Sequence, residues 1–231
     1  RLSPPDPVSL RDRIAREIAL TGPMTVADSV FDEVGGRSDA DFAAAYADLL
    51  NKEARALSEA GADVIQIDEP CFNIYTDEVK DWGLEILERA FDGVTAKRAV
   101  HICYGYGTEV VLNWKKANDD WSHYNATLPL IADSSIDQIS IECAASGVDL
   151  SVLDCLAGKD VMVGVIDVGT EEVESAQVVA DRIRHAMQHV SAEHLIACTD
   201  CGMVPRSRRA AEGKMNALAA GAALVNRELG A

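Results

Sequence analysis

The feature of this sequence that most limits its fold is an alternation of short apolar runs with longer amphipathic stretches, repeated without a linker-like break. The short runs predict strands. The longer stretches carry apolar residues at spacings of three and four, which is typical of helices. The predicted strands span residues 18–21, 63–68, 98–103, 138–143, 161–167 and 195–199, and the predicted helices span 40–60, 79–90, 121–132, 150–156, 172–189 and 208–229.

Strands that alternate with helices pair in parallel through right-handed crossovers, in an open doubly wound sheet or a closed barrel. Chemically capable residues stand at nearly every predicted strand end, as at the active face of a barrel, and no glycine-rich loop follows the first strand, as in a dinucleotide-binding fold. We therefore expect an α/β fold of the (β/α)8 TIM barrel class. Since six strands are recognisable, residues 1–231 are expected to form a single catalytic barrel domain of the C-terminal six βα units, with the first two βα units absent from this chain.

The charge and the cysteines narrow the range of partners. A formal net charge of −17 argues against binding nucleic acid or an anionic membrane surface, both of which require clustered basic residues. No apolar stretch approaches the roughly 20 residues of a membrane span. The six cysteines form no dense disulfide framework, so reduced thiols and a cytoplasmic location are expected.

The alternation of side chains along a strand predicts which polar residues share one face of the sheet. His101 and Cys103 are two positions apart, so on a strand they share one face, opposite Val100 and Ile102. The same alternation predicts that Ser140 and Glu142 point into the barrel, as do Gln66 and Asp68. Asp167 ends the fifth predicted strand and is a catalytic candidate, and Cys201 follows the sixth.

Imidazole, two thiolates and a carboxylate form a donor set that Zn²⁺ prefers, so His101, Cys103, Glu142 and Cys201 are the predicted metal ligands. A zinc-bound thiol ionises near neutral pH, which suits a site that activates a substrate thiol. Asp68 is placed to hold the ammonium group of an amino-acid substrate.

Each of these residues also has a plainer interpretation. His101 and Cys103 could be core residues, Glu142 could be a salt-bridge partner, and Asp68 could cap the segment that follows it. Cys198 and Cys201 form a C-x-x-C pair, which could be redox-active or half of a zinc knuckle. Because strand alternation would turn the two in opposite directions, Cys198 is assigned to packing. The same assignment is made for the remaining cysteines, Cys71, Cys143 and Cys155.

At these residues the chain resembles the zinc-dependent, cobalamin-independent methionine synthase family, and most closely its short core-type members. The matching stretches follow the family's order along nearly the whole chain: Thr21-Gly-Pro-Met-Thr25, Ile65-Gln-Ile-Asp-Glu-Pro70, His101-Ile-Cys-Tyr104, Ile139-Ser-Ile-Glu142, Gly164-Val-Ile-Asp167 and Thr199-Asp-Cys-Gly202.

The resemblance implies a barrel in which His101, Cys103, Glu142 and Cys201 bind catalytic zinc and Asp68 binds the amino group of homocysteine. The sulfur of homocysteine would then accept a methyl group from N5 of a tetrahydrofolate, giving methionine. The family's first two strands have no counterpart in this chain, in agreement with the two missing βα units.

The departures from the family pattern concern the methyl donor. The long enzymes have a tryptophan where this chain has Ser29, a histidine proton donor where it has Gly169, and a folate-contacting glutamate where it has Ile74. Methylcobalamin or a methylated corrinoid protein therefore stays open as donor. The resemblance to short members from aerobic bacteria favours methyltetrahydrofolate and implies a companion protein.

Two further alternatives concern the acceptor and the role of the metal. The same metal site could alkylate another small thiol, such as coenzyme M. A protein of a different class, a non-catalytic zinc-bearing barrel or a partner module for a corrinoid protein, would hold the metal in a closed site with four protein ligands.

Overall fold

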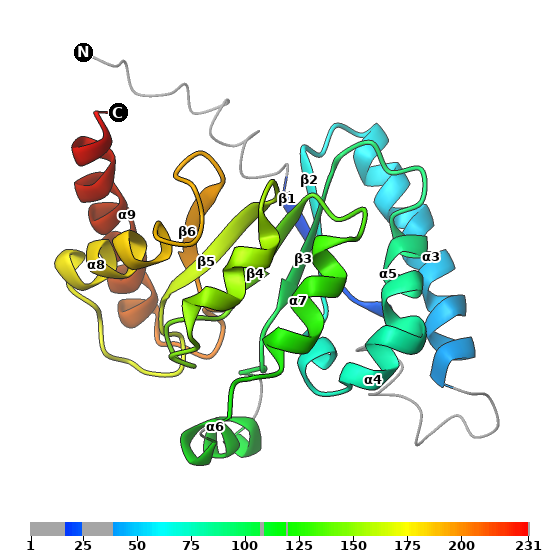
Figure 1. The fold of residues 1–231 in the computed structure, drawn as a ribbon, viewed down its shortest axis with the longest axis horizontal. Coiled ribbons are helices and arrows are strands. Elements are labelled where there is room, and N and C mark those ends of the chain that lie inside the picture. The colour runs from blue at the N-terminus through cyan, green and yellow to red at the C-terminus, as the bar shows by residue number, and fades with distance from the viewer. Residues whose placement is uncertain (1–16, 25–38, 107–108, 119, 231) are drawn as a thin grey trace.

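The computed structural model describes residues 17–24, 39–106, 109–118 and 120–230. A six-stranded parallel sheet in the order β1-β2-β3-β4-β5-β6 forms its centre (Figure 1). The strands are β1 (Glu17–Thr21), β2 (Val64–Asp68), β3 (Lys97–Ile102), β4 (Gln138–Ile141), β5 (Asp160–Ile166) and β6 (Leu195–Thr199). Each lies within two residues of the predicted bounds at both ends.

The order of the strands identifies the class of fold. A doubly wound sheet reverses its strand order at a switch point, whereas these six strands follow one another in sequence order. The α/β barrel class is therefore confirmed, and the chain forms a part of such a barrel. All carboxyl ends of the parallel strands lie at the same edge of the sheet, which is where the predicted site residues stand.

The helices cover the outer side of the sheet, with α3 and α5 near β1 to β3 and with α8 and α9 beside β5 and β6 (Figure 1). The helical elements are α3 (Asp39–Glu59), η1 (Pro70–Asn73), α4 (Thr76–Glu78), η2 (Val79–Gly83), α5 (Leu84–Ala90), α6 (Glu109–Ala117), α7 (Tyr124–Ala132), η3 (Leu150–Leu156), α8 (Ala176–Ala186) and α9 (Arg208–Leu229). No helix of the described residues is both long enough and apolar enough to cross a membrane.

Several helices differ from the prediction: 79–90 divides into η2 and α5, 121–132 begins at Tyr124, and 150–156 is the 3-10 helix η3. The helix predicted from residue 172 begins only at Ala176, because Ser175 is its N-cap and accepts a hydrogen bond from the Val178 amide at 3.2 Å. Helix α6 was not predicted at all, and it stands at the carboxyl end of β3, apart from the helices that cover the sheet (Figure 1).

The core lies between the sheet and these helices. Ile65 and Ile67 of β2, Val100 and Ile102 of β3, and Ile139 and Ile141 of β4 are completely buried there. Full burial of such a side chain contributes about 1.5–3 kcal/mol. Because neighbours in a strand alternate, this apolar face turns the intervening polar residues toward the barrel interior.

Candidate metal centre and substrate cavity

Three of the four predicted ligands come together. His101 is the second-to-last residue of β3, Cys103 directly follows the strand, and Cys201 lies just past β6. One donor atom from each lies within 4.8 Å of the others, and the two Sγ atoms are 3.9 Å apart. Strands β3 and β6 are separated in the sheet by β4 and β5. These three residues, the metal triad below, therefore meet across the barrel interior.

The imidazole of His101 has the environment of a metal ligand. The side chain is buried, and its Nδ1 lies 2.9 Å from Ser140 Oγ, a contact that fixes the plane of the ring. Its other nitrogen, Nε2, is buried and has no hydrogen-bond partner among the described residues. A buried polar atom without a partner is costly, so an unpartnered imidazole nitrogen in a group with two thiols fits a metal ligand better than a packing role.

The charges of the triad are coupled. A hydrogen bond from the Cys103 thiol, reinforced by His101, lowers the pKa of Cys201 to about 4. The same hydrogen bond, together with burial, raises the pKa of Cys103 well above its ordinary value. Burial lowers the pKa of His101, but the contact with the Cys201 thiolate outweighs it, so the net shift is upward. The negative charge of Cys201 and the positive charge of His101 thus each favour the other.

The fourth predicted ligand, Glu142, has a different partner. It follows the last residue of β4 and is completely buried. Lys115 Nζ, from α6, lies 2.6 Å from Glu142 Oε1 and 2.7 Å from Oε2, and Oε2 also accepts the Tyr104 amide at 3.1 Å. The metal triad, as a group within 4.8 Å, does not include this carboxylate. Ligation by Glu142 stays a prediction, and the salt-bridge alternative describes its state here.

A cavity of about 250 Å³ adjoins the triad. Its walls are formed by Gln66, Asp68, His101, Ser140, Met162, Cys198, Thr199, Cys201 and Gly202. Gln66, Asp68, His101 and Ser140 therefore point inward, as predicted from the alternation along their strands.

Asp68 is the carboxylate that enters this cavity, whereas its neighbour Glu69 turns away. Asp68 Oδ1 accepts a hydrogen bond from Gln66 Nε2 at 2.9 Å, and burial raises its pKa, an effect that His101 partly offsets. Glu69 instead accepts the Met24 amide at 2.9 Å. A carboxylate in a small cavity beside a candidate metal site can hold the ammonium group of a small ligand.

Comparison with known proteins agrees with this geometry. The sequence profile of the family described as "Cobalamin-independent synthase, Catalytic domain" matches residues 8–223. The chain belongs to this family. A methionine synthase from Thermococcus kodakarensis is 33% identical over 224 residues, which cover 95% of this chain and 61% of that protein. The chain thus spans about three fifths of the length of this curated relative.

Solved structures share the fold of this chain. A B12-independent methionine synthase from Shewanella sp. W3-18-1, solved in complex with selenomethionine, has a TM-score of 0.86 and 46% identity over 92% of this chain and 62% of that chain. A methyltransferase from Methanosarcina mazei has a TM-score of 0.63 at 18% identity, over 88% of this chain and 57% of that chain, and supports the fold alone.

Two predictions about this family member are modified by the structure. Cys198 and Cys201 line the same cavity rather than facing in opposite directions, and the packing role of Cys198 stays a prediction. Strand alternation does not extend to Cys201, since β6 ends at Thr199, whose hydroxyl donates to the Cys201 carbonyl at 2.8 Å. Asp167 does not line the cavity. Its amide donates to Glu174 Oε1 at 2.9 Å, and its Oδ1 accepts the Gly169 amide at 2.6 Å.

Of the three departures from the family pattern, two lie in the described part of the chain. Gly169 lies beside Tyr106, because a Cβ placed on it would be 3.6 Å from the tyrosine ring. Ile74 follows η1 and is exposed. Ser29 lies outside the described residues.

Asp200 is a site residue that the sequence analysis missed. It is completely buried, its Oδ1 accepts the Cys143 and Ala144 amides at 3.0 and 2.9 Å, and its Oδ2 accepts the Ala145 amide at 2.7 Å. Burial and the charge of Glu142 raise its pKa to about 7, against these amides. Asp200 thereby fixes the loop after Glu142 to the loop that carries Cys201. The only sequence signal was its place in the Thr199-Asp-Cys-Gly202 motif.

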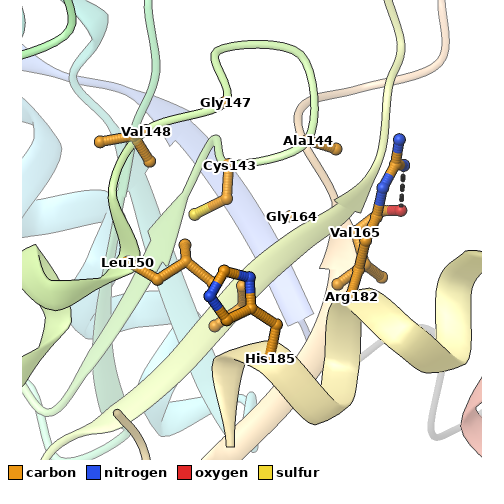
Figure 2. A pocket seen from close by; sticks show the side chains of 10 residues that line it. Cys143, Ala144, Gly147, Val148, Leu150, Gly164, Val165, Arg182 and His185 are labelled. Atoms are coloured by element: carbon orange, nitrogen blue, oxygen red, sulfur yellow. Dashed lines mark hydrogen bonds between the residues drawn. The ribbon is translucent and has the colours of Figure 1, made fainter. Parts of the chain in front are cut away.

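A second cavity, of about 220 Å³, lies between β5, the loop after β4, and α8 (Figure 2). Cys143, Leu150 and His185 approach one another there, and Arg182 Nη1 donates to the Val165 carbonyl at 2.8 Å. Burial raises the pKa of the Cys143 thiol well above its ordinary value. A buried neutral thiol agrees with the packing role predicted for Cys143, and no triad residue lines this cavity.

Proposed function

We propose that this chain is the thiol-activating part of a zinc-dependent methyltransferase that converts homocysteine to methionine. The observation that carries the proposal is the meeting of His101, Cys103 and Cys201 around a buried, unpartnered imidazole nitrogen, beside a cavity that Asp68 enters. Membership of the cobalamin-independent synthase family supports the same reaction. Six free cysteines fit a reducing, cytoplasmic setting.

The residues have distinct roles in this proposal. His101, Cys103 and Cys201 hold zinc, with Glu142 as the fourth protein donor. Bound zinc supplies the Lewis acidity that ionises the substrate thiol near neutral pH. Asp68 holds the ammonium group of homocysteine, and Ser140 orients the His101 ring.

The residues and the substrate on the methyl-donor side of the reaction form a separate part of the proposal. Asp167 is proposed as the catalytic carboxylate, placed where β5 ends. 5-Methyltetrahydrofolate is the proposed methyl donor, with a companion protein. Turnover assays with different donors and acceptors distinguish two alternatives, a methylated corrinoid as the methyl donor and coenzyme M as the methyl acceptor.

Replacement of a thiolate ligand tests the metal site. We expect Cys201→Ser and Cys103→Ser to abolish zinc binding and methionine formation together, because serine is a poor zinc ligand. Metal content is measured by elemental analysis of the full-length protein. Cys155→Ser is the matched control, since Cys155 is exposed and outside the site. Full zinc and full turnover in Cys201→Ser would refute the assignment.

Turnover assays of the full-length protein identify the substrates. Homocysteine is offered with methyltetrahydrofolate or with methylcobalamin, and coenzyme M replaces homocysteine in parallel. Zinc-edge absorption adds an independent measurement, because only the true acceptor adds a sulfur ligand. If no thiol perturbs the metal, the zinc is structural and the enzyme proposal fails.

A further inference from the structure

The ammonium group of Lys115 has a closely built environment at the metal centre. Its side chain is only 8% exposed and the Glu142 side chain is completely buried. Lys115 Nζ contacts both oxygens of Glu142 and donates to the Gly105 carbonyl at 3.2 Å. It also lies 3.4 Å from the centre of the Tyr106 ring, a cation–π distance. All of these partners are near the triad, since Gly105 and Tyr106 follow Cys103 closely in the chain.

The position of Lys115 affects any metal held by the triad. A divalent cation and an ammonium group that share one buried carboxylate repel each other, and the repulsion is strong where water is excluded. The more Glu142 is held by Lys115, the weaker its bond to the metal. Catalytic zinc sites keep three protein ligands and one exchangeable position, and His101, Cys103 and Cys201 already supply three.

We propose that Lys115 is a positioning residue that competes with zinc for Glu142 and so keeps one coordination position available to the substrate thiol. The inference rests on the proposed function, because it assumes that the triad binds zinc. It assigns a role to α6, the helix that carries Lys115 to the carboxyl ends of the strands. Glu142 is then a ligand that exchanges between zinc and Lys115 rather than a permanent fourth donor.

The first test is the zinc affinity of Lys115→Met, measured on the full-length protein by competition with a chromophoric chelator. Methionine keeps an unbranched side chain and removes the charge. With its competitor gone, Glu142 binds zinc and the affinity rises about tenfold, the scale of effects from groups around a metal site. Lys116→Met is the matched control, because Lys116 is the next residue of α6 and is exposed. Unchanged or weaker zinc binding in Lys115→Met would overturn the inference.

A second variant keeps the inference testable if Lys115→Met does not fold. Glu142→Gln leaves Lys115 in place and removes the carboxylate. If Lys115 already weakens the bond from Glu142, this change lowers zinc affinity by less than about tenfold, whereas Cys103→Ser lowers it by at least about a hundredfold. Equal losses in the two variants refute the competition.

Zinc-edge absorption supplies a readout that does not depend on turnover. On addition of homocysteine, the parent protein exchanges an oxygen ligand for sulfur, and Lys115→Met retains the oxygen of Glu142. In the Glu142→Gln background, Lys115→Met has no effect on affinity, because the two residues act as one unit. If the parent protein binds no zinc, the proposed function itself fails. If it binds zinc but Lys115→Met does not change the affinity, only the role of Lys115 fails.

Discussion

Two lysine–glutamate pairs are buried in the described part of the chain, one at the candidate metal centre and one under the loop that follows β5. The side chains of Lys115 and Glu142 are 8% and 0% exposed, and those of Lys214 and Glu174 are 0% and 10% exposed. The charges and the degree of burial are alike, so the pairs differ mainly in what else faces the carboxylate.

The surroundings of the two carboxylates separate a structural pair from a functional one. Glu174 accepts the Asp167 amide at 2.9 Å, lies 3.6 Å from Arg182 and is 3.0 Å from Lys214, so all its neighbours are fixed groups of the fold. Glu142 has a fixed amide partner too, but it also lies beside the metal triad. Both cations at Glu174, Lys214 and Arg182, are fixed side chains of the fold. The proposed zinc ion at Glu142 would be an exchangeable cation, and a buried ion pair can change partners only where such a cation is present.

The largest expected effect is on the structural pair. Lys214→Met leaves the buried Glu174 with Arg182, 3.6 Å away, as its remaining counter-ion, and we expect the free energy of unfolding to fall by about 3 kcal/mol. The ammonium of Lys214 also donates to the Glu172 carbonyl, so the loop carrying Asp167 loses its attachment to α9. Urea denaturation of the metal-free protein measures the change.

The control for this variant is an exposed lysine of another long helix. Lys52→Met in α3 should leave the urea midpoint unchanged, because Lys52 is exposed. Zinc affinity of the Lys214→Met protein should equal that of the parent. A shift in zinc affinity as large as that of Lys115→Met would show that the two pairs do not differ in the way proposed.

The fold and the triad were within reach of the sequence, whereas Lys115 was not. Strand positions and the inward direction of His101 follow from a period of two, a local pattern that tertiary structure preserved. Helix α6 has a weak signal, with β-branched Val110 and Val111 in its first turn. Its lysine meets a carboxylate 27 positions away, and no local pattern encodes that contact.

Asp200 escaped prediction for another reason. Besides the Tyr106 hydroxyl, its hydrogen-bond donors are the backbone amides of Cys143, Ala144 and Ala145, and every residue except proline has such an amide. The Asp200 side chain also needs space beside Gly164, and the sequence alone does not show that these two residues are neighbours. A Cβ on Gly164 would lie 2.1 Å from Asp200 Oδ1, so glycine at that position permits the aspartate to reach the three amides.

An intermediate effect is expected for the pair at the metal centre. Lys115→Met should lower the free energy of unfolding of the metal-free protein by about 2 kcal/mol, the scale of a hydrogen bond to a charged group. The loss is smaller than in Lys214→Met because α6 is a short helix set apart from the others (Figure 1). Denaturation is measured with and without zinc.

The gain in stability on addition of zinc should differ between Lys115→Met and Lys214→Met. A ligand stabilises the folded state in proportion to the logarithm of its affinity, so zinc should stabilise Lys115→Met more than the parent protein. It should stabilise Lys214→Met no more than the parent. Equal gains in all three proteins would show that Glu142 does not pass from Lys115 to the metal.

The smallest effect is expected for a pair that is less buried. Arg98 binds Asp137 through Nε at 2.9 Å and Nη2 at 3.0 Å, and these side chains are 30% and 40% exposed. Solvent screens the attraction, so Arg98→Met should cost about 1 kcal/mol or less. Salt at about 0.5 M, where the screening length is about 4 Å, should reduce the difference further. Urea denaturation measures the loss. If the free energy of unfolding fell as much as in Lys214→Met, burial would not be what distinguishes these ion pairs. The larger contribution of the Lys115 and Lys214 pairs to stability would then have to come from hydrogen-bond geometry.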